Sequence, residues 1–300
     1  MAYQLSWIKN FQFAGEYVAD YRKYYQKFGL QQVDLFSGGP NIIVDAIVAS
    51  GKALVGQSTP DYMTNAIRHG AELKCIGACY QRNNAGIVSM SKNPILTPQD
   101  VIGKKIGVPI INIVKWHAFL KLNKIDPSLT SSVPVQFEFG PLISGEVAGF
   151  FGALNDDAVE LQTAGYDVHS MLLSDFGYKM FGTIYSVLAE SLEDKAKRAQ
   201  LVAFMKAESL GWQDVVNDPA MAADLTVNVY GKGNGLNLAE QKACCIATND
   251  DIVSADTQKH GLFWMTPESV EETIASLALG GAKATSDMYT NEILEEAYQR

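Results

Sequence analysis

QLSWIKNFQFAGEYVADYRKYY, residues 4–25, contains the change of pattern on which the fold interpretation depends. Apolar residues alternate up to Trp7, as in a strand, and then recur at the spacing of a helix that Gly29 ends. In an open α/β sheet, the loop that leaves the carboxyl end of a strand and enters a helix faces the ligand crevice. This turn is therefore predicted to place four side chains at a binding site: Trp7, Asn10, Phe11 and Phe13.

The aromatic residues of this turn allow two interpretations. A Trp and two Phe suit a flat aromatic guest, and they would be costly if they were merely solvated. The alternative is that they pack on neighbouring loops as ordinary core. The sequence leaves both possibilities open.

The composition indicates a soluble globular protein with an excess of negative charge. The chain has 300 residues, 47% hydrophobic and 19% charged, and its formal net charge is -9. Its mean hydropathy is -0.01. A chain of this length can bury two compact lobes. Nucleic acid and anionic membrane surfaces are not expected as partners, and no apolar run approaches the roughly 20 residues of a membrane span.

A near-repeat indicates that the two lobes share one plan. Residues 50–61 are SGKALVGQSTPD and residues 144–157 are SGEVAGFFGALNDD. Each copy runs from a helix end through Ser-Gly, a strand and a polar turn into a helix that a glycine ends, and then into a further strand. If the strands are equivalent, both polar turns lie at carboxyl ends and face each other across a cleft.

These turns supply the next candidates for the site. Helix capping alone would explain their residue types, but it would not explain the matched placement in both copies. We therefore favour a role in lining the site for Ser58, Thr59, Asn155, Asp156 and Asp157.

Further candidates follow other predicted strands. The turn after the strand at 32–36 precedes a helix start whose N–H groups could hold a carbonyl, carboxylate or phosphate, although a plain tight turn is an equal alternative. No phosphate-binding glycine motif is present. Core packing is the favoured alternative for Trp116. The candidates of this group are Gly38, Pro40, Asn41, Tyr80, Asn83, Asn112, Trp116 and Tyr178.

The order of these motifs resembles the substrate-binding proteins of ABC importers. The matching features are Trp-x-x-Asn at 7–10, SGKAxVG at 50–56, GKKIGVP at 103–109, and SGEVxGxxG at 144–152 with Asn155. The branch that it resembles contains binders of thiamine pyrimidine precursors, riboflavin, sulfonates and nitrate. The resemblance implies a type II periplasmic-binding-protein fold, in which two α/β lobes are joined by two crossing strands with a ligand cleft between them. Lobe 1 is expected at residues 1–86 and 186–300, and lobe 2 at residues 87–185.

The resemblance also implies a function without chemistry. The protein would bind a small planar heterocycle, in the first place a thiamine pyrimidine precursor, and deliver it to a membrane permease. Riboflavin, sulfonate or nitrate are the alternative ligands. The branch commonly has His where Phe13 stands and Glu near Asp156 or Asp157. A sulfonate would call for positive charge, and these turns carry Lys9 and Arg82 alone. The implied location is the periplasm or a lipid anchor at the cell surface, with the export signal removed, and the implied state is a monomer.

The alternative from another class is an enzyme. Pyrimidine synthases of thiamine biosynthesis share the fold and use a Cys-rich motif, an iron and a consumed His. Here Cys244 and Cys245 are only a pair, and the four histidines show no metal-ligand spacing. The sequence therefore predicts a carrier with no catalytic residue, no cofactor and no metal.

Overall fold

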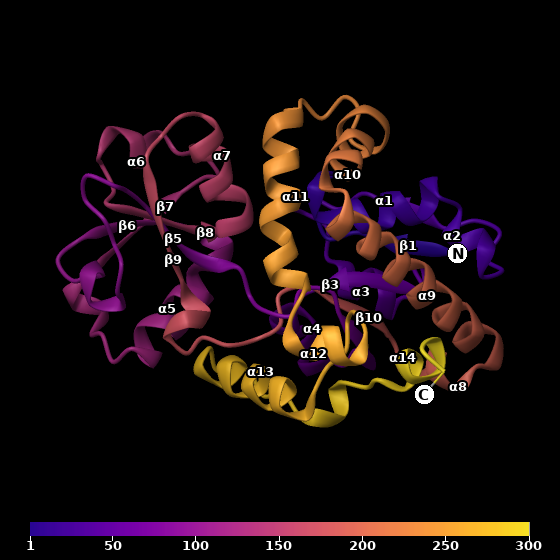
Figure 1. Cartoon of the computed structure of the whole chain (residues 1–300). Coiled ribbons are helices and arrows are strands. Elements are labelled where there is room, and N and C mark those ends of the chain that lie inside the picture. The colour runs from indigo at the N-terminus through magenta and orange to yellow at the C-terminus, as the bar shows by residue number, and fades with distance from the viewer. Residues whose placement is uncertain (300) are drawn as a thin grey trace. The chain divides into compact units, whose positions relative to one another are not determined.

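The computed structural model describes residues 1–299, which form two compact units. The first unit comprises residues 1–81, 181–271 and the chain from 283 onward, and the second comprises residues 82–180 and 272–282. Each unit contains its own five-stranded sheet (Figure 1).

In the first unit, three parallel strands begin the sheet and one antiparallel strand interrupts it. The order is β2-β1-β3-β10-β4. Strand β1 (Ala2–Gln4) pairs in parallel with β2 (Asp34–Phe36) and β3 (Val55–Ser58). Strand β10 (Ile184–Leu188) lies antiparallel between β3 and β4 (Leu73–Ala78).

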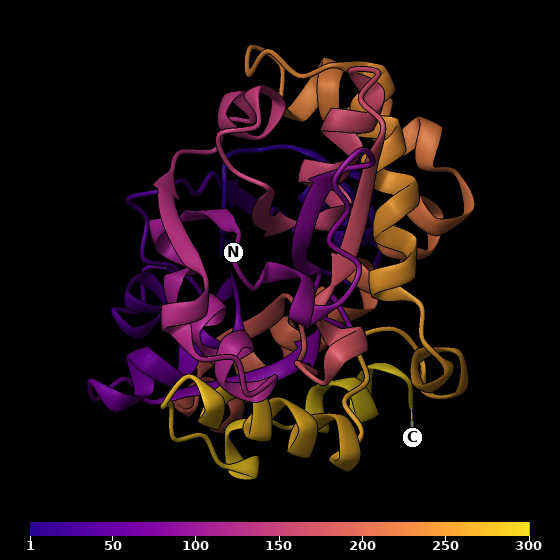
Figure 2. The same cartoon turned by 90° about the vertical axis from the view of Figure 1, so that its left-hand side faces the viewer.

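The second unit repeats this topology (Figure 2, purple to magenta). Its order is β7-β6-β8-β5-β9, with β6 (Lys105–Pro109) parallel to β7 (Ser131–Val135) and β8 (Gly149–Ala153). Strand β5 (Ala85–Met90) lies antiparallel between β8 and β9 (Val168–Leu172). The two copies of the near-repeat become β3–α4–β4 and β8–α7–β9, so the prediction of two lobes on one plan is confirmed.

Helices cover both sheets. Those of the first unit are α1 (Ala14–Tyr21), α2 (Tyr24–Lys27), α3 (Val44–Ala49), α4 (Pro60–Arg68), α8 (Glu190–Glu193), α9 (Lys195–Asn217), α10 (Pro219–Leu225), α11 (Leu238–Ile252), α12 (Ala255–His260) and α14 (Glu292–Ala297). Those of the second are α5 (Ile113–Leu122), α6 (Gly140–Ser144) and α7 (Val159–Thr163). Within residues 1–299, no helix has the length and apolar character needed to cross a membrane.

Helix α13 (Pro267–Leu279) begins in the first unit and ends in the second. Its second part is held there by Ser276 Oγ, which donates to the carbonyl of Lys179, and by an ion pair of 2.7 Å between Lys179 and Glu272. No sequence signal indicated that residues 272–282 would group with the second unit.

Two glycines allow α1 to pack closely on α9. A Cβ on Gly15 would lie 2.4 Å from ring atoms of Trp212, and a Cβ on Gly211 would lie 2.2 Å from the carbonyl oxygen of Gly15. Any larger residue would push the helices apart. The expected single helix after the first turn is interrupted at Lys23, where φ is 59°, and continues as α2.

The close packing of α1 on α9 encloses two acids in the core of the first unit. Glu16 on α1 and Glu208 on α9 are each 0% exposed. The hydroxyl of Tyr3 donates to Glu16 over 3.0 Å, and those of Tyr25 and Tyr185 donate to Glu208. Burial raises the pKa of Glu16 to about 8, and it raises the pKa of Glu208 well above its usual value.

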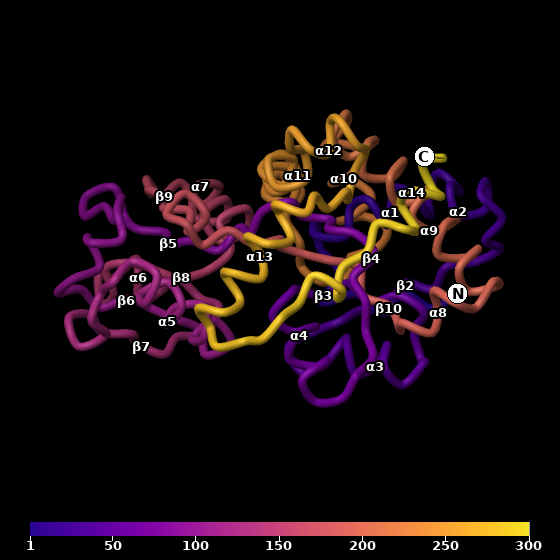
Figure 3. The backbone as a smooth tube through the Cα atoms, turned by 90° about the horizontal axis from the view of Figure 1, so that it is seen from below, coloured from indigo at the N-terminus to yellow at the C-terminus, as the bar shows by residue number. Residues whose placement is uncertain are grey.

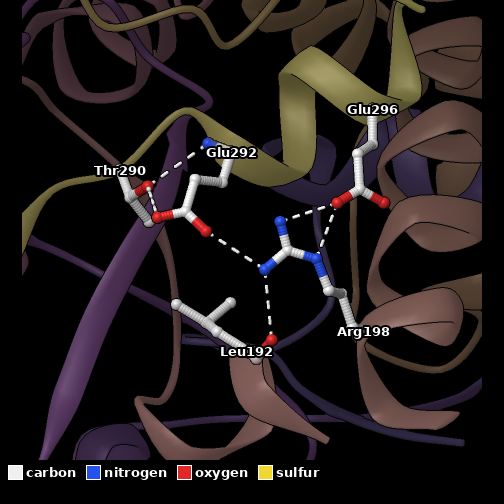
Figure 4. Close-up of polar contacts among 5 residues, drawn as sticks. All are labelled: Leu192, Arg198, Thr290, Glu292 and Glu296. Atoms are coloured by element: carbon white, nitrogen blue, oxygen red, sulfur yellow. Dashed lines mark hydrogen bonds and ion pairs between the residues drawn. The ribbon is translucent and has the colours of Figure 1, made fainter. Parts of the chain in front are cut away.

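The C-terminal helix α14 packs against α9 (Figure 3), and one arginine adds polar contacts between them (Figure 4). The guanidinium of Arg198 donates to Glu296 over 2.6 Å, to Glu292 over 3.1 Å and to the carbonyl of Leu192 over 3.1 Å. Its planar fork therefore joins three acceptors from two segments of the chain.

Replacing Arg198 by lysine tests this connection. Lysine keeps the charge but lacks the fork, so Arg198→Lys should lower the free energy of unfolding by about 0.5–1 kcal/mol in urea denaturation. The control is Lys197→Ala, which removes a single exposed ion pair with Glu190 and should have a smaller effect. Equal losses in the two variants would contradict a special role for Arg198.

The buried Glu16 leads to a second prediction, on how the free energy of unfolding depends on pH. The native state keeps this proton up to about pH 8, whereas the unfolded chain releases it near 4.5. Because the native state binds more protons between these values, the free energy of unfolding should fall as pH rises through this window, by at most about 1.4 kcal/mol per pH unit for one group.

Urea denaturation of Glu16→Gln between about pH 5 and 8 measures this effect. Glutamine keeps the shape of the neutral acid, so the variant should lose much of the decline. The control Glu146→Gln makes the same substitution at an exposed position and should retain the decline. An identical pH dependence in Glu16→Gln and the parent protein would mean that Glu16 is ionised in the native state.

Candidate functional site

The loops after the parallel strands β1, β2 and β3 leave the same edge of the first sheet and carry many of the predicted residues. The N–H of Gly38 donates to the carbonyl of Trp7 over 2.8 Å. A Cβ on Gly38 would lie 2.4 Å from the backbone of Ser6, so this approach of the two loops requires glycine. The structure thus brings Trp7 and Gly38 together. Pro40 and Asn41, which follow Gly38 closely in sequence, are exposed.

The aromatic turn after β1 divides into exposed and buried parts. Trp7 is half-buried, and the side chain of Asn10 accepts from the N–H of Gln12 and caps a 3-10 turn at Phe11–Phe13. Phe11 and Phe13 are fully buried, and the N–H of Phe11 donates to Gln241 on α11. For these two Phe residues the structure favours the core alternative, because the 3-10 turn points both rings inward.

At the end of β3, the predicted hydroxyls are already hydrogen-bonded. Ser58 is buried and donates to Asp45 over 2.5 Å, and Ser186 donates to the other oxygen of the same carboxylate over 2.9 Å. Burial raises the pKa of Asp45, although both hydroxyls oppose this rise. Thr59 stands at the N-cap of α4, but its hydroxyl donates to the side chain of Asp61. Capping through its side chain, the alternative for Thr59, is therefore absent.

A buried network that the sequence interpretation missed lies behind this edge. Ser6 donates to the side-chain oxygen of Gln57 over 2.7 Å, and the amide nitrogen of Gln57 donates to Glu16 over 3.2 Å. Gln57 is fully buried in β3. The available signal was a glutamine at the end of an apolar strand, where an inward position demands a polar partner.

Tyr80 lies in the core of the first unit. Its ring meets the ring of Trp212 edge-on at 6.3 Å, and its backbone exchanges hydrogen bonds with Gly182 and Thr183. Tyr80 is 3% exposed and has little surface to offer a solute. Its contact with a solute stays a prediction.

In the second unit, the residues after β8 form a compact polar group with the residue that precedes β5. Asn84 donates to the side chain of Asn155 over 2.6 Å, and the N–H of Ala153 donates to Asp157 over 2.6 Å. A Cβ on Gly152 would lie 1.7 Å from Asp157, so glycine makes room for this carboxyl. Burial is the main cause that raises the pKa of Asp157, and the charge of Asp156 raises it further.

The other candidates of the second unit are dispersed. Asn83 accepts from the N–H of Ala85, and Asn112 is the half-buried N-cap residue of α5. Trp116 is 1% exposed and packs against Phe119 and Phe151, which supports the favoured core alternative. Tyr178 is also buried.

These groups offer hydrogen-bond donors and acceptors. Among residues 1–299, no group of three or more His, Cys, Asp or Glu is placed to hold a metal ion. All four cysteines are buried. Burial raises the pKa of Cys75 and Cys245 to about 12, and it raises the pKa of Cys79 as well. Thiols of this kind are poor nucleophiles at neutral pH.

Solved structures share this fold. The periplasmic aliphatic sulphonate binding protein SsuA from Escherichia coli has a TM-score of 0.70 at 13% identity, over 93% of this chain and 86% of its own. The desulfurization enzyme DszB has a TM-score of 0.62 at 13% identity, over 100% and 99%. At such identities the likeness shows the fold alone. The periplasmic-binding-protein fold expected from the resemblance is thereby confirmed, while carriers and enzymes both use it.

Sequence comparison adds a relative and a family. The chain is 26% identical over 231 residues to the riboflavin-binding protein RibY of Chloroflexus aurantiacus, which covers 74% of this chain and 64% of RibY. The match therefore spans less than two thirds of that relative's length. A family model described as NMT1/THI5 like matches residues 10–222. Because this match covers more than half of the sequence, the chain belongs to the NMT1/THI5-like family.

Proposed function

We propose that this protein is the solute-binding component of an ABC importer. It would act outside the cytoplasm as a monomer, carry a small planar heterocycle and deliver it unaltered to a membrane permease. The observation that carries the proposal is that carboxyl groups follow the equivalent strands β3 and β8. They are Asp61 in the first unit and Asp156 and Asp157 in the second.

These carboxyl groups favour a donor-bearing solute over an anion. Asp61 lies in the first turn of α4, where a helix terminus would otherwise attract an oxyanion. A sulfonate or nitrate would be repelled by this charge. An amino or imide N–H would instead donate to a carboxylate, and such charge-assisted bonds contribute about 1.5–3 kcal/mol where water is excluded.

Thiamine pyrimidine precursors and riboflavin both have flat rings with N–H donors. The likeness to RibY supports riboflavin as the first probe, and the aminopyrimidine remains the alternative. Among the aromatic candidates, Trp7 keeps partial exposure while Phe11, Phe13, Tyr80, Trp116 and Tyr178 are buried. We therefore assign the stacking contact to Trp7.

The enzyme alternative receives less support than the carrier. A thiol nucleophile would need an exposed, ionisable cysteine, and the four cysteines are buried. Polar groups at the strand ends are fixed by hydrogen bonds within the protein, as suits a binding surface that is formed in advance.

A ligand screen tests the proposal. Thermal-shift measurements would compare riboflavin, an aminopyrimidine, an alkanesulfonate and nitrate, each at millimolar concentration. A heterocycle bound with micromolar affinity should add about 4 kcal/mol to the stability of the native state. Stabilisation by the sulfonate and by neither heterocycle would refute the assignment of the ligand, and conversion of a bound compound into a product would refute the carrier role.

Replacement of Trp7 tests the stacking contact. Trp7→Ala should raise the dissociation constant of the bound heterocycle about tenfold, because an aromatic pair contributes about 0.5–1.5 kcal/mol beyond burial. Trp7→Phe should recover much of the loss. Trp264→Ala is the matched control, since Trp264 is another half-buried Trp of the first unit, stacked on His260. Isothermal titration with equal effects in Trp7→Ala and Trp264→Ala would contradict the assignment.

A further inference from the structure

The hydroxyls at the carboxyl edge of the first sheet all donate inward or along the chain. Ser6 donates to Gln57, Ser58 donates to Asp45, and Thr59 donates to Asp61. A hydroxyl has a single proton and two acceptor positions. The single O–H of each of these groups is therefore already used as a donor. Each hydroxyl can bond to a further partner only as an acceptor.

For Ser58 and Thr59 the partner is a carboxyl oxygen that accepts from the hydroxyl. Ser6 is different, since its partner is an amide that has a donor end and an acceptor end. The direction of this bond depends on which end of Gln57 faces Ser6. What holds the amide in place therefore decides what Ser6 offers.

Glu16 holds the amide. Its Oε1 atom accepts from the amide nitrogen of Gln57 over 3.2 Å and from the hydroxyl of Tyr3 over 3.0 Å. Because Oε1 accepts both bonds, the proton of the neutral Glu16 is on Oε2. A reversed amide would set its oxygen against Oε1, and this buried acceptor would lose a donor. The nitrogen of Gln57 therefore stays with Glu16, and its oxygen stays with Ser6.

The surroundings of Glu16 give this arrangement little freedom. Glu16 is 0% exposed, and its Oε2 atom has no hydrogen-bond partner within residues 1–299. Gln57 is equally buried, and Ser6 is half-buried directly after the residue that follows β1. The network thus runs from the core to the loop that contains Trp7.

We propose that Glu16 is a positioning residue which, through Gln57, holds the hydroxyl of Ser6 as a hydrogen-bond acceptor for an N–H or O–H group of the solute. The inference rests on the proposed solute-binding function and extends it to the selection of the solute. An imide, amino or hydroxyl group would be accepted at Ser6. An oxyanion, which brings only acceptors, would find no proton there.

Riboflavin binding, measured by isothermal titration, tests the proposal through paired substitutions. Gln57→Leu removes the amide that links Glu16 to Ser6 and nearly keeps the side-chain volume. It should weaken riboflavin binding about five- to tenfold, as expected for the loss of one hydrogen bond between Ser6 and the solute. Ser6→Ala should weaken binding by a similar factor. In the Ser6→Ala background, Gln57→Leu should cause no further loss, because both act on the same bond.

Substitutions of Glu16 separate positioning from general damage. Glu16→Leu should weaken binding like Gln57→Leu, whereas Glu16→Gln, which keeps an acceptor for the amide of Gln57, should restore the affinity. Glu208→Gln alters the neighbouring acid of the same core, which does not bond to Gln57, and should leave the affinity unchanged. Independent and additive effects of Ser6→Ala and Gln57→Leu would overturn the inference.

Two outcomes distinguish this inference from the proposed function. If the parent protein binds riboflavin but Gln57→Leu binds it as tightly, the inference fails and the proposed function stands. If the parent protein binds an alkanesulfonate in place of a heterocycle, both fail. A cycle in urea denaturation needs no solute: a coupling between Ser6→Ala and Gln57→Leu supports the network, and additive losses of stability overturn it.

Discussion

The parallel pairing of β1 with β2 and β3 is the constraint on which the rest of the first unit depends. Parallel strands end at one edge, so the turns at Trp7, Gly38 and Ser58 leave the sheet on the same side although they are far apart in sequence. The second unit repeats the arrangement with β6, β7 and β8. The common edge at the strand ends is therefore a consequence of topology, and the side chains in the turns decide which groups that edge presents.

The core of the first unit is coupled to that edge through polar groups. Gly15 and Gly211 let α1 approach α9, and this approach buries Glu16 and Glu208 among tyrosines. Buried acids are costly unless they are neutral or hydrogen-bonded, and the raised pKa of Glu16 reflects this cost. A core made only of apolar residues would offer no acceptor to the amide nitrogen of Gln57.

Much of the architecture was accessible from patterns of short range. The change of period near Trp7, the Ser-Gly-strand-turn-helix repeat and the glycines at helix ends are local signals, and they predicted the two lobes on one plan. The same patterns predicted aromatic candidates without distinguishing their environments. Phe11 and Phe13 lie in a turn, as Trp7 does, yet they are buried against α11 because of how that helix packs, more than 200 residues later in the chain.

The sequence by itself determined the order of strands and helices, the repeat and the acidic character of the turns, because each is set by periodicity and residue type over a few turns of chain. Tertiary structure decided the partners of the polar side chains. Glu16 and Gln57 are 41 residues apart, and the local sequence around each does not predict that the other will be its partner. Whether a hydroxyl such as that of Ser6 donates or accepts depends on the group that folding places beside it, and no spacing in the chain encodes that.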